Sequence, residues 1–117
     1  MERDRMQIQN AYREKTNAAH DAFGGKNFTK LAKLLLEKGE IATKMYEIEG
    51  TDLWDIRTYG AYNAAGWSFE YFCDFITASS CYRLALTSCE RIATNRSPEW
   101  QKNINHLKSL IERVEKK

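Results

Sequence analysis

The stretch from Tyr59 to Leu86, YGAYNAAGWSFEYFCDFITASSCYRLAL, constrains the fold more than any other part of the chain. Small residues recur where two helices can approach closely, and bulky residues recur where the space between them needs filling. The small residues are Ala64, Ala65, Gly66, Ala78 and Ala85, and the bulky ones are Tyr62, Phe69, Phe75 and Tyr82. Between the two halves, Asp74 can accept a backbone N–H and cap the second helix. The stretch therefore predicts an antiparallel helical hairpin.

The order of these residues resembles one tetratricopeptide repeat, over residues 59–88, about a quarter of the chain. The resemblance is carried by Tyr62, Ala65, Gly66, Phe69, Asp74, Phe75, Ala78, Tyr82 and Ala85. The chain departs from the family pattern where Trp, Leu, a turn Gly and Pro are usual and where it has Tyr62, Ala65, Cys73 and Glu90. The resemblance implies a helical scaffold that binds other proteins through a groove. It implies no chemical reaction.

Apolar residues recur at helical intervals along the whole chain and predict five helices. The first covers residues 4–23 and is expected to end where Gly24 and Gly25 adopt positive φ. The second runs from an N-cap at Asn27 to Gly50, and the third from Thr51 or Asp52 to about Phe72. The fourth runs from Asp74 to about Thr94, with Ile76 on its buried face, and the last begins at Ser97 and Pro98.

These helices predict an all-α fold of about five antiparallel helices in a single domain, residues 1–117. Two architectures fit. One is a long-helix stack similar to tetratricopeptide proteins, and the other is an ordinary up-and-down bundle. The equivalent alanines Ala32 and Ala78 are 46 residues apart, against about 34 in a standard repeat, so the sequence alone leaves both open.

The third and last helices have different apolar patterns. The third is rich in aromatic residues on more than one face, which predicts packing on two or more sides and a central position. The last has one narrow apolar seam, formed by Trp100, Ile104, Leu107, Ile111 and Val114. Such a helix can close one end of a helical stack, or pair with the same seam of another copy to form a homodimer.

Composition excludes several classes of protein. The net charge of +2 arises from mixed charges, so nucleic-acid binding is disfavoured, although two basic segments around Lys30 and Lys116 leave it open. No apolar run is long enough for a membrane span. Three cysteines without a C-x-x-C pair, and an N-terminus without a secretory signal, predict reduced thiols and a cytoplasmic protein.

The sequence offers little for catalysis or metal binding. His20 and His106 stand alone in their helices, without the spacings of zinc or di-iron ligands, and no phosphate-binding loop is present. Arg13 and His20 loosely match a pattern of helical ribonucleases, but they are seven residues apart. We therefore predict a non-enzymatic protein with no catalytic residues, no metal and no cofactor.

The remaining prediction is recognition of another protein or peptide by an adaptor, regulatory or inhibitor module. In tetratricopeptide proteins the first helix of each pair lines the groove. The resemblance thus implies that partner contacts come from Asn63, Trp67, Glu70 and Tyr71, with Trp54 and Arg57 nearby. Core packing is the alternative for each of these residues, and above all for Trp67 and Tyr71. The alternative function is a self-associating structural subunit of a larger assembly, one that could contain RNA or DNA.

Overall fold

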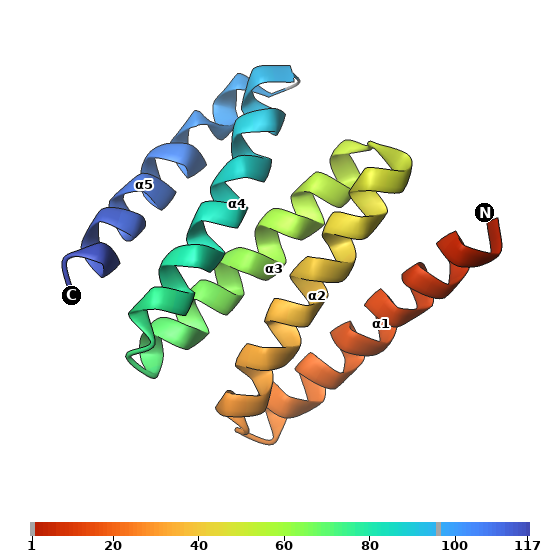
Figure 1. Cartoon of the computed structure of the whole chain (residues 1–117), viewed down its shortest axis with the longest axis horizontal. Coiled ribbons are helices and arrows are strands. Elements are labelled where there is room, and N and C mark those ends of the chain that lie inside the picture. Colours follow the sequence, from red (N-terminus) through yellow and green to blue (C-terminus); the bar gives the residue numbers. More distant parts are fainter. Residues whose placement is uncertain (1, 96) are drawn as a thin grey trace.

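The computed structural model describes residues 2–95 and 97–117, which form five α-helices and a short 3-10 turn, with no strand among them. The elements are α1 (Glu2–Gly24), α2 (Phe28–Glu49), α3 (Asp52–Tyr71), α4 (Phe75–Asn95), η1 (Pro98–Trp100) and α5 (Gln101–Glu115). Successive helices run antiparallel, and each packs mainly on its neighbours in the sequence (Figure 1). The predicted all-α fold is confirmed, as an up-and-down helical bundle.

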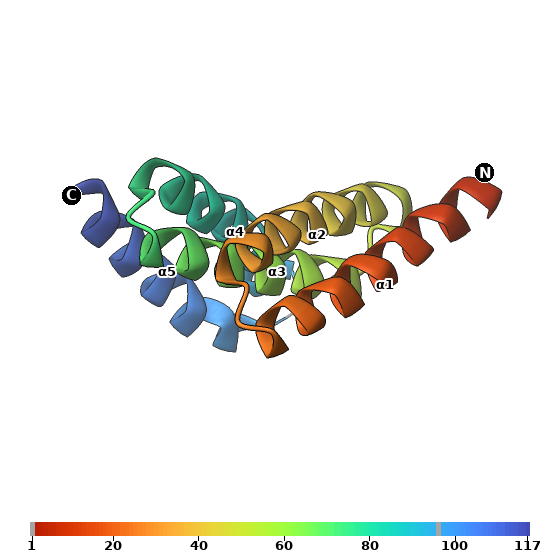
Figure 2. The ribbon, with the colours of Figure 1, turned by 90° about the horizontal axis from the view of Figure 1, so that it is seen from below.

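The bundle is a flat slab that measures 44 × 38 × 20 Å. Helices α1, α3 and α5 lie toward one side of it, and α2 and α4 toward the other (Figure 2). Helix α3 lies in the middle and packs on both α2 and α4, which explains why its apolar residues occupy several faces. Within the described residues, each helix is too short or too polar to cross a bilayer.

Several predicted helix ends are confirmed by their hydrogen bonds. The side-chain oxygen of Asn27 accepts from the backbone N–H of Lys30 at 3.2 Å and caps α2. Asp74 caps α4 in the same way, accepting from the N–H of Thr77 at 3.2 Å. Gly50 ends α2 with φ of 65°, the left-handed conformation that glycine adopts without a steric penalty.

Two predictions about helix ends were wrong. After α1 the positive φ falls on Lys26 (59°) instead of Gly24 or Gly25, because the turn closes through bonds from Lys26 N–H to Phe23 C=O and from Asn27 N–H to Ala22 C=O. The α3–α4 turn repeats this geometry with Cys73 at φ 61°. Ser97 makes no side-chain capping bond, and the chain enters α5 through η1 instead.

Two glycines let tyrosine rings lie directly on a neighbouring helix. A Cβ atom added at Gly66 of α3 would stand 2.5 Å from the ring of Tyr82 on α4, and one at Gly39 of α2 would stand 2.8 Å from the ring of Tyr62 on α3. Both distances are too short for a methyl group. Close approach at these glycines therefore fixes the spacing of α2, α3 and α4.

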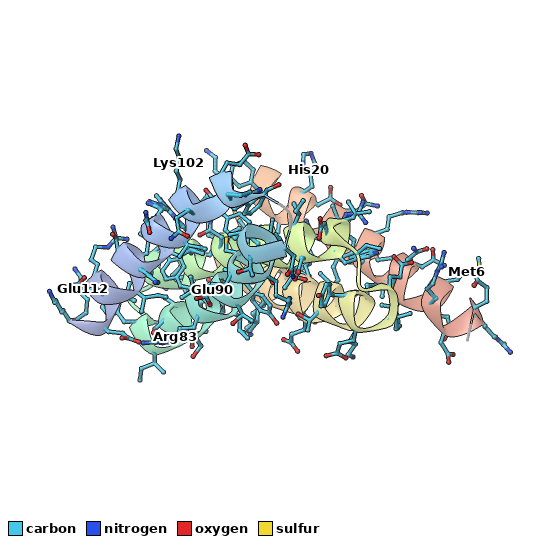
Figure 3. All side chains as sticks on the ribbon, turned by 90° about the horizontal axis from the view of Figure 1, so that it is seen from above. Met6, His20, Arg83, Glu90, Lys102 and Glu112 are labelled. Carbon is cyan, nitrogen blue, oxygen red and sulfur yellow. The ribbon has the colours of Figure 1, made fainter. Side chains whose placement is uncertain are left out.

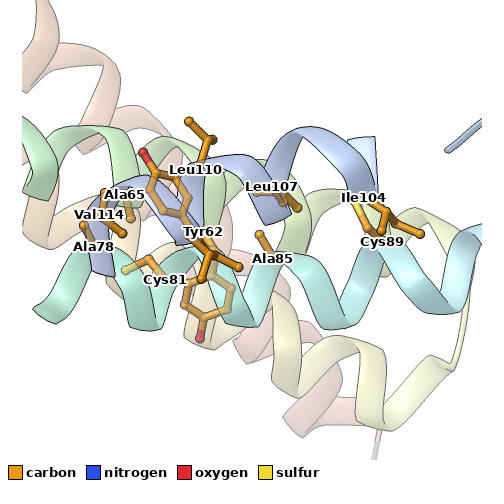
Figure 4. Packing of buried hydrophobic residues seen from close by; sticks show 12 residues of the cluster. Tyr62, Ala65, Ala78, Cys81, Ala85, Cys89, Ile104, Leu107, Leu110 and Val114 are labelled. Carbon is orange, nitrogen blue, oxygen red and sulfur yellow. The ribbon is translucent and has the colours of Figure 1, made fainter. Parts of the chain in front are cut away.

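The largest buried cluster joins α3, α4 and α5. Figure 4 shows Ile104 and Leu107 of α5 lying against Cys89 and Ala85 of α4. Most of the apolar seam of the last helix is thus buried against α4 within the chain. Ile76 is 85 % exposed, contrary to our prediction, because α4 turns its side chain away from both α3 and α5.

An ion pair with a buried carboxylate joins the start of α3 to the end of α4. Asp55 of α3 is only 2 % exposed, and its Oδ1 accepts a hydrogen bond from Arg91 Nη2 of α4 at 2.7 Å. The same guanidinium lies over the ring of Tyr46 on α2, 4.3 Å from the ring centroid. The hydrogen bonds that Arg91 donates to the Asp55 carboxylate raise the pKa of Arg91. One cation therefore links α2, α3 and α4.

The glycine contacts can be tested with a matched pair of substitutions in α3. Gly66→Ala should lower the free energy of unfolding by about 1 to 3 kcal/mol, because the new methyl group displaces the Tyr82 ring. At Gly60 an added Cβ meets nothing within 4 Å, so Gly60→Ala should stabilise the protein by up to about 1 kcal/mol. Urea denaturation monitored by circular dichroism measures both. Equal effects of the two variants would contradict the assigned packing.

The buried ion pair has its own test. Arg91→Ala leaves the carboxylate of Asp55 buried without a partner and should cost about 2 to 3 kcal/mol of unfolding free energy. Arg83, also on α4, pairs with Glu115 at the surface, so Arg83→Ala is the control and should cost less than about 1 kcal/mol. Thermal denaturation of both variants gives the comparison. A loss at Arg91 no larger than that at Arg83 would show that Asp55 is well solvated.

Candidate functional site

Five aromatic side chains form an exposed cluster where α1, α2 and α3 come together. They are Phe23, Phe28, Trp67, Tyr71 and Phe72, and we refer to them as the aromatic cluster. Trp67 is 60 % and Tyr71 is 75 % exposed. The ring centroids of Phe28 are 6.3 Å from those of Phe23 and Tyr71, and Tyr71 is 5.3 Å from Phe72. The rings therefore support one another while facing outward.

The aromatic cluster lines a hollow of about 290 Å³, together with Leu31 and Ser68. The hollow continues between α1 and α3 over the side chains of Leu35 and Lys38 of α2. Small residues keep this central section open, because Gly60 and Ala64 present no bulk on α3. His20 of α1 lines the same section, and Figure 3 shows it projecting away from the ribbon.

The far end of this depression carries cations. Gln9, Tyr12, Arg13, Thr16, Trp54 and Arg57 line it. The guanidinium carbon of Arg57 is 4.6 Å from the centroid of a Trp54 ring and 5.4 Å from that of Tyr12. The Nζ of Lys38 lies 5.2 Å from the centroid of Tyr12. We call the whole depression, from the aromatic cluster to this cationic end, the α1–α3 groove.

Burial shifts the protonation equilibria at the cationic end. Desolvation lowers the pKa of Lys38, and the positive charge of Arg57 lowers it further. Desolvation also raises the pKa of Tyr12, so its phenol stays neutral. Lys38 is thus partly removed from water and is repelled by the neighbouring charge of Arg57.

The predicted partner-binding residues fall into two sets. Asn63 and Trp67 line the groove between α1 and α3, Tyr71 lines its aromatic end, and Arg57 lines its cationic end. The side-chain oxygen of Asn63 has no hydrogen-bond partner within residues 2–95 and 97–117. These four remain the candidate contacts.

Trp54 lies at the base of the cationic end of the groove, whereas Glu70 lines none of its three sections. Trp54 is only 2 % exposed, and its indole N–H donates to Glu49 Oε2 at 2.7 Å. Glu70 faces α4 and α5 instead, where its carboxylate accepts from the Tyr82 hydroxyl at 2.8 Å and from Arg113 Nη2 at 2.7 Å. In the free chain Trp54 thus packs in the core and Glu70 ties α3 to α4 and α5, and partner contact at these two positions stays a prediction.

Sequence reasoning missed most of the aromatic cluster. Phe23, the last residue of the predicted first helix, is exposed. Phe28 and Phe72 stand at helix ends, outside any stripe, and that position was the only signal available. Lys38 was also missed, because its neighbours on α1 and α3 are distant in the sequence.

No arrangement typical of catalysis or metal binding is seen in the described part of the chain. No three His, Cys, Asp or Glu side chains gather there as a metal site. Arg13 and His20 lie in different sections of the groove. Burial raises the pKa of Cys81 to about 11 and that of Cys89 to about 12, so neither thiol ionises near neutral pH.

Comparison with known proteins found no matching family model, no matching curated protein and no matching solved structure. The resemblance to a tetratricopeptide repeat therefore stays a prediction. The candidate site rests on the geometry and charge of the groove itself.

Thiol reactivity tests the burial of the two cysteines of α4. At pH 8 the folded protein should react rapidly with one equivalent of a disulfide reagent at Cys73, which is exposed. Cys81 and Cys89 should react only after unfolding, since both are buried and their thiols stay protonated until the pH approaches their raised pKa values. Absorbance of the released thiolate follows the reaction, with the protein in denaturant as the reference for three equivalents. Fast reaction of all three in the folded state would contradict the packing of α4.

Proposed function

We propose that this protein is a non-enzymatic interaction module that holds a segment of another protein in the α1–α3 groove. The observation that carries the proposal is the aromatic cluster, in which large apolar rings from three helices are exposed side by side. Contiguous apolar patches rimmed by polar residues are typical of protein-binding surfaces. Scattered single residues would carry no such meaning.

The physical basis is the free energy gained when a partner removes the exposed rings from water. Each Å² of apolar surface removed from water contributes about 25 cal/mol, and Trp and Tyr bury large areas with few rotatable bonds. Contacts between rings, such as Phe28 with Tyr71, already restrict their motion in the free protein. Binding therefore loses less conformational entropy than it would with isolated side chains.

The resemblance of residues 59–88 to a tetratricopeptide repeat supports the same function. In that family the first helix of the hairpin faces the ligand, and here α3 contributes Asn63, Trp67 and Tyr71 to the groove. We place the module in the cytoplasm, where its three free cysteines would stay reduced. Adaptor, regulatory and inhibitor roles are all compatible with such a groove, and the identity of the partner would distinguish them.

A second copy of the chain is the competing occupant of the aromatic cluster. It would correspond to the alternative function, a self-associating subunit. Because the seam of α5 is buried against α4, self-association would have to use the exposed rings instead. Light scattering over a dilution series separates the two: a monomer supports the module, and a dimer lost on Trp67→Ala supports the subunit.

The proposed function predicts that single truncations in the groove weaken capture without unfolding the protein. Trp67→Ala and Tyr71→Ala should each weaken binding of a captured partner by about 2 kcal/mol, roughly thirtyfold in Kd. Because both side chains are exposed, unfolding free energy should change by less than about 0.5 kcal/mol. Quantitative affinity capture from the native cell lysate, with calorimetry on the purified partner, measures the loss.

The control for these variants is Leu84→Ala, which truncates an exposed apolar residue of α4 outside the groove. It should leave binding unchanged. Equal capture by wild type, Trp67→Ala and Tyr71→Ala would refute the groove as the binding surface. A large loss of helicity in either variant would assign those residues to the core.

A further inference from the structure

We propose that the α1–α3 groove takes an acidic amphipathic helix, whose apolar side chains pack on the aromatic cluster and whose carboxylates reach Arg13, Lys38 and Arg57. The inference rests on the proposed function and adds the chemistry of the occupant. Three observations support it: the groove has no acidic lining residues, its cations have no counter-charges, and its length matches a short helix.

The lining of the groove is free of acidic residues. None of the side chains that line its three sections, within residues 2–95 and 97–117, is Asp or Glu. The chain as a whole has 16 acidic and 18 basic residues, so this absence is local. The groove instead contains Arg13, Lys38 and Arg57, with His20 between them and the aromatic cluster.

Three acidic residues of α2 and α3 are engaged by other groups. Glu37 of α2 binds Lys15 at 2.9 Å, and Glu49 binds Arg5 at 3.2 Å. Asp55 binds Arg91, as described above. No carboxylate pairs with Arg13, Lys38 or Arg57 in the described part of the chain. The three cations therefore lack counter-charges of their own.

Two of these cations, Lys38 and Arg57, are held in positions that favour binding of an anion. Arg57 and Lys38 lie on the ring of Tyr12, which holds their positions and removes part of their hydration. Their mutual repulsion is relieved when a carboxylate lies between them. An acidic partner would therefore gain more here than at freely solvated surface lysines.

The dimensions match a short helix. Arg57 and Tyr71 are separated by fourteen residues of α3, which is about 21 Å at 1.5 Å per residue. Helices α1 and α3 run in the same direction (Figure 1), so the walls of the groove are roughly aligned. About four turns of a partner helix fit this length, with apolar residues at one end and acidic residues at the other.

Segregation of the charges favours a peptide over single-stranded nucleic acid. A nucleic-acid strand carries a phosphate beside every base, so its groove needs cations along the stacking rings. The section lined by the aromatic cluster contains no charged side chain. A peptide can place its acidic residues at one end only, as this groove requires.

The test begins with selection from a displayed library of random 16-residue peptides, fused at both ends so that no terminal carboxylate is free. The wild-type protein should enrich peptides with aromatic or aliphatic residues at helical spacing toward one end and Asp or Glu toward the other. Enrichment of neutral or basic peptides would overturn the inference and leave the proposed function standing. No enrichment beyond that of the Trp67→Ala, Tyr71→Ala double variant would overturn both.

The best enriched peptide is then used with charge variants in fluorescence anisotropy. Lys38→Gln with Arg57→Gln should weaken its binding at least about tenfold, and raising the salt from about 50 to about 500 mM should weaken wild-type binding but not that of the variant. Lys44→Gln, which changes an exposed lysine of α2 that lines no section of the groove, is the control and should bind as the wild type does. Equal binding by all three would contradict the assigned role of the cations.

Two further measurements complete the test. Arg57→Gln could lower stability through lost contact with Trp54. In that case the Lys38→Gln, Arg13→Gln double variant takes the place of the Lys38→Gln, Arg57→Gln variant, because Arg13 is exposed and its substitution should not affect stability. A fluorescent 16-nucleotide single-stranded RNA serves as the other probe. Tighter binding of that RNA than of the peptide, lost on the same substitutions, would assign the groove to nucleic acid and refute the acidic helix.

Discussion

Close approach of helices at glycine determines much of this structure. The rings of Tyr62 and Tyr82 each lie on a glycine of the neighbouring helix, at Gly39 and Gly66. Two contacts of the same kind set the distances from α2 to α3 and from α3 to α4. The tyrosines fill the space that each missing side chain leaves, so the helices pack closely without a void. Helix α3 is thereby held from both sides at the centre of the slab.

The position of α3 leads directly to the groove. Because α3 uses two of its faces for α2 and α4, a third face remains between α1 and α5. On that face small residues at Gly60 and Ala64 are followed by exposed rings at Trp67 and Tyr71. The same packing that buries one set of aromatic residues thus leaves another set accessible. Core and candidate site are therefore parts of one arrangement.

The sequence predicted the helices well because their signals are local. Caps at Asn27 and Asp74 and the left-handed Gly50 depend on residues within one turn. The left-handed residue after α1 was assigned to a glycine, whereas the closing bonds place it at Lys26. Turn geometry, and not residue preference alone, decides which residue adopts positive φ.

The candidate site was only partly predictable, because it joins helices that are distant in the sequence. Trp67 and Tyr71 could be assigned to a surface through the resemblance, but the same reasoning did not show that Trp54 is buried or that Glu70 faces α4 and α5. The direction of each side chain depends on which neighbours α3 meets, and Glu70 is turned toward α4 and α5 by Tyr82 and Arg113. Periodicity cannot supply that information, since both faces of α3 are rich in aromatic residues.

Helix α1 provides one whole wall of the groove, yet among its described residues only Ala19 and Ala22 are buried. Its other contacts come from partly buried side chains such as Ile8 and Tyr12, and from ion pairs such as Lys15 with Glu37. A ligand that spans α1 and α3 would add its own contacts to these. Binding in the groove and docking of the first helix are then thermodynamically linked, because such a ligand stabilises the arrangement in which both walls are in place.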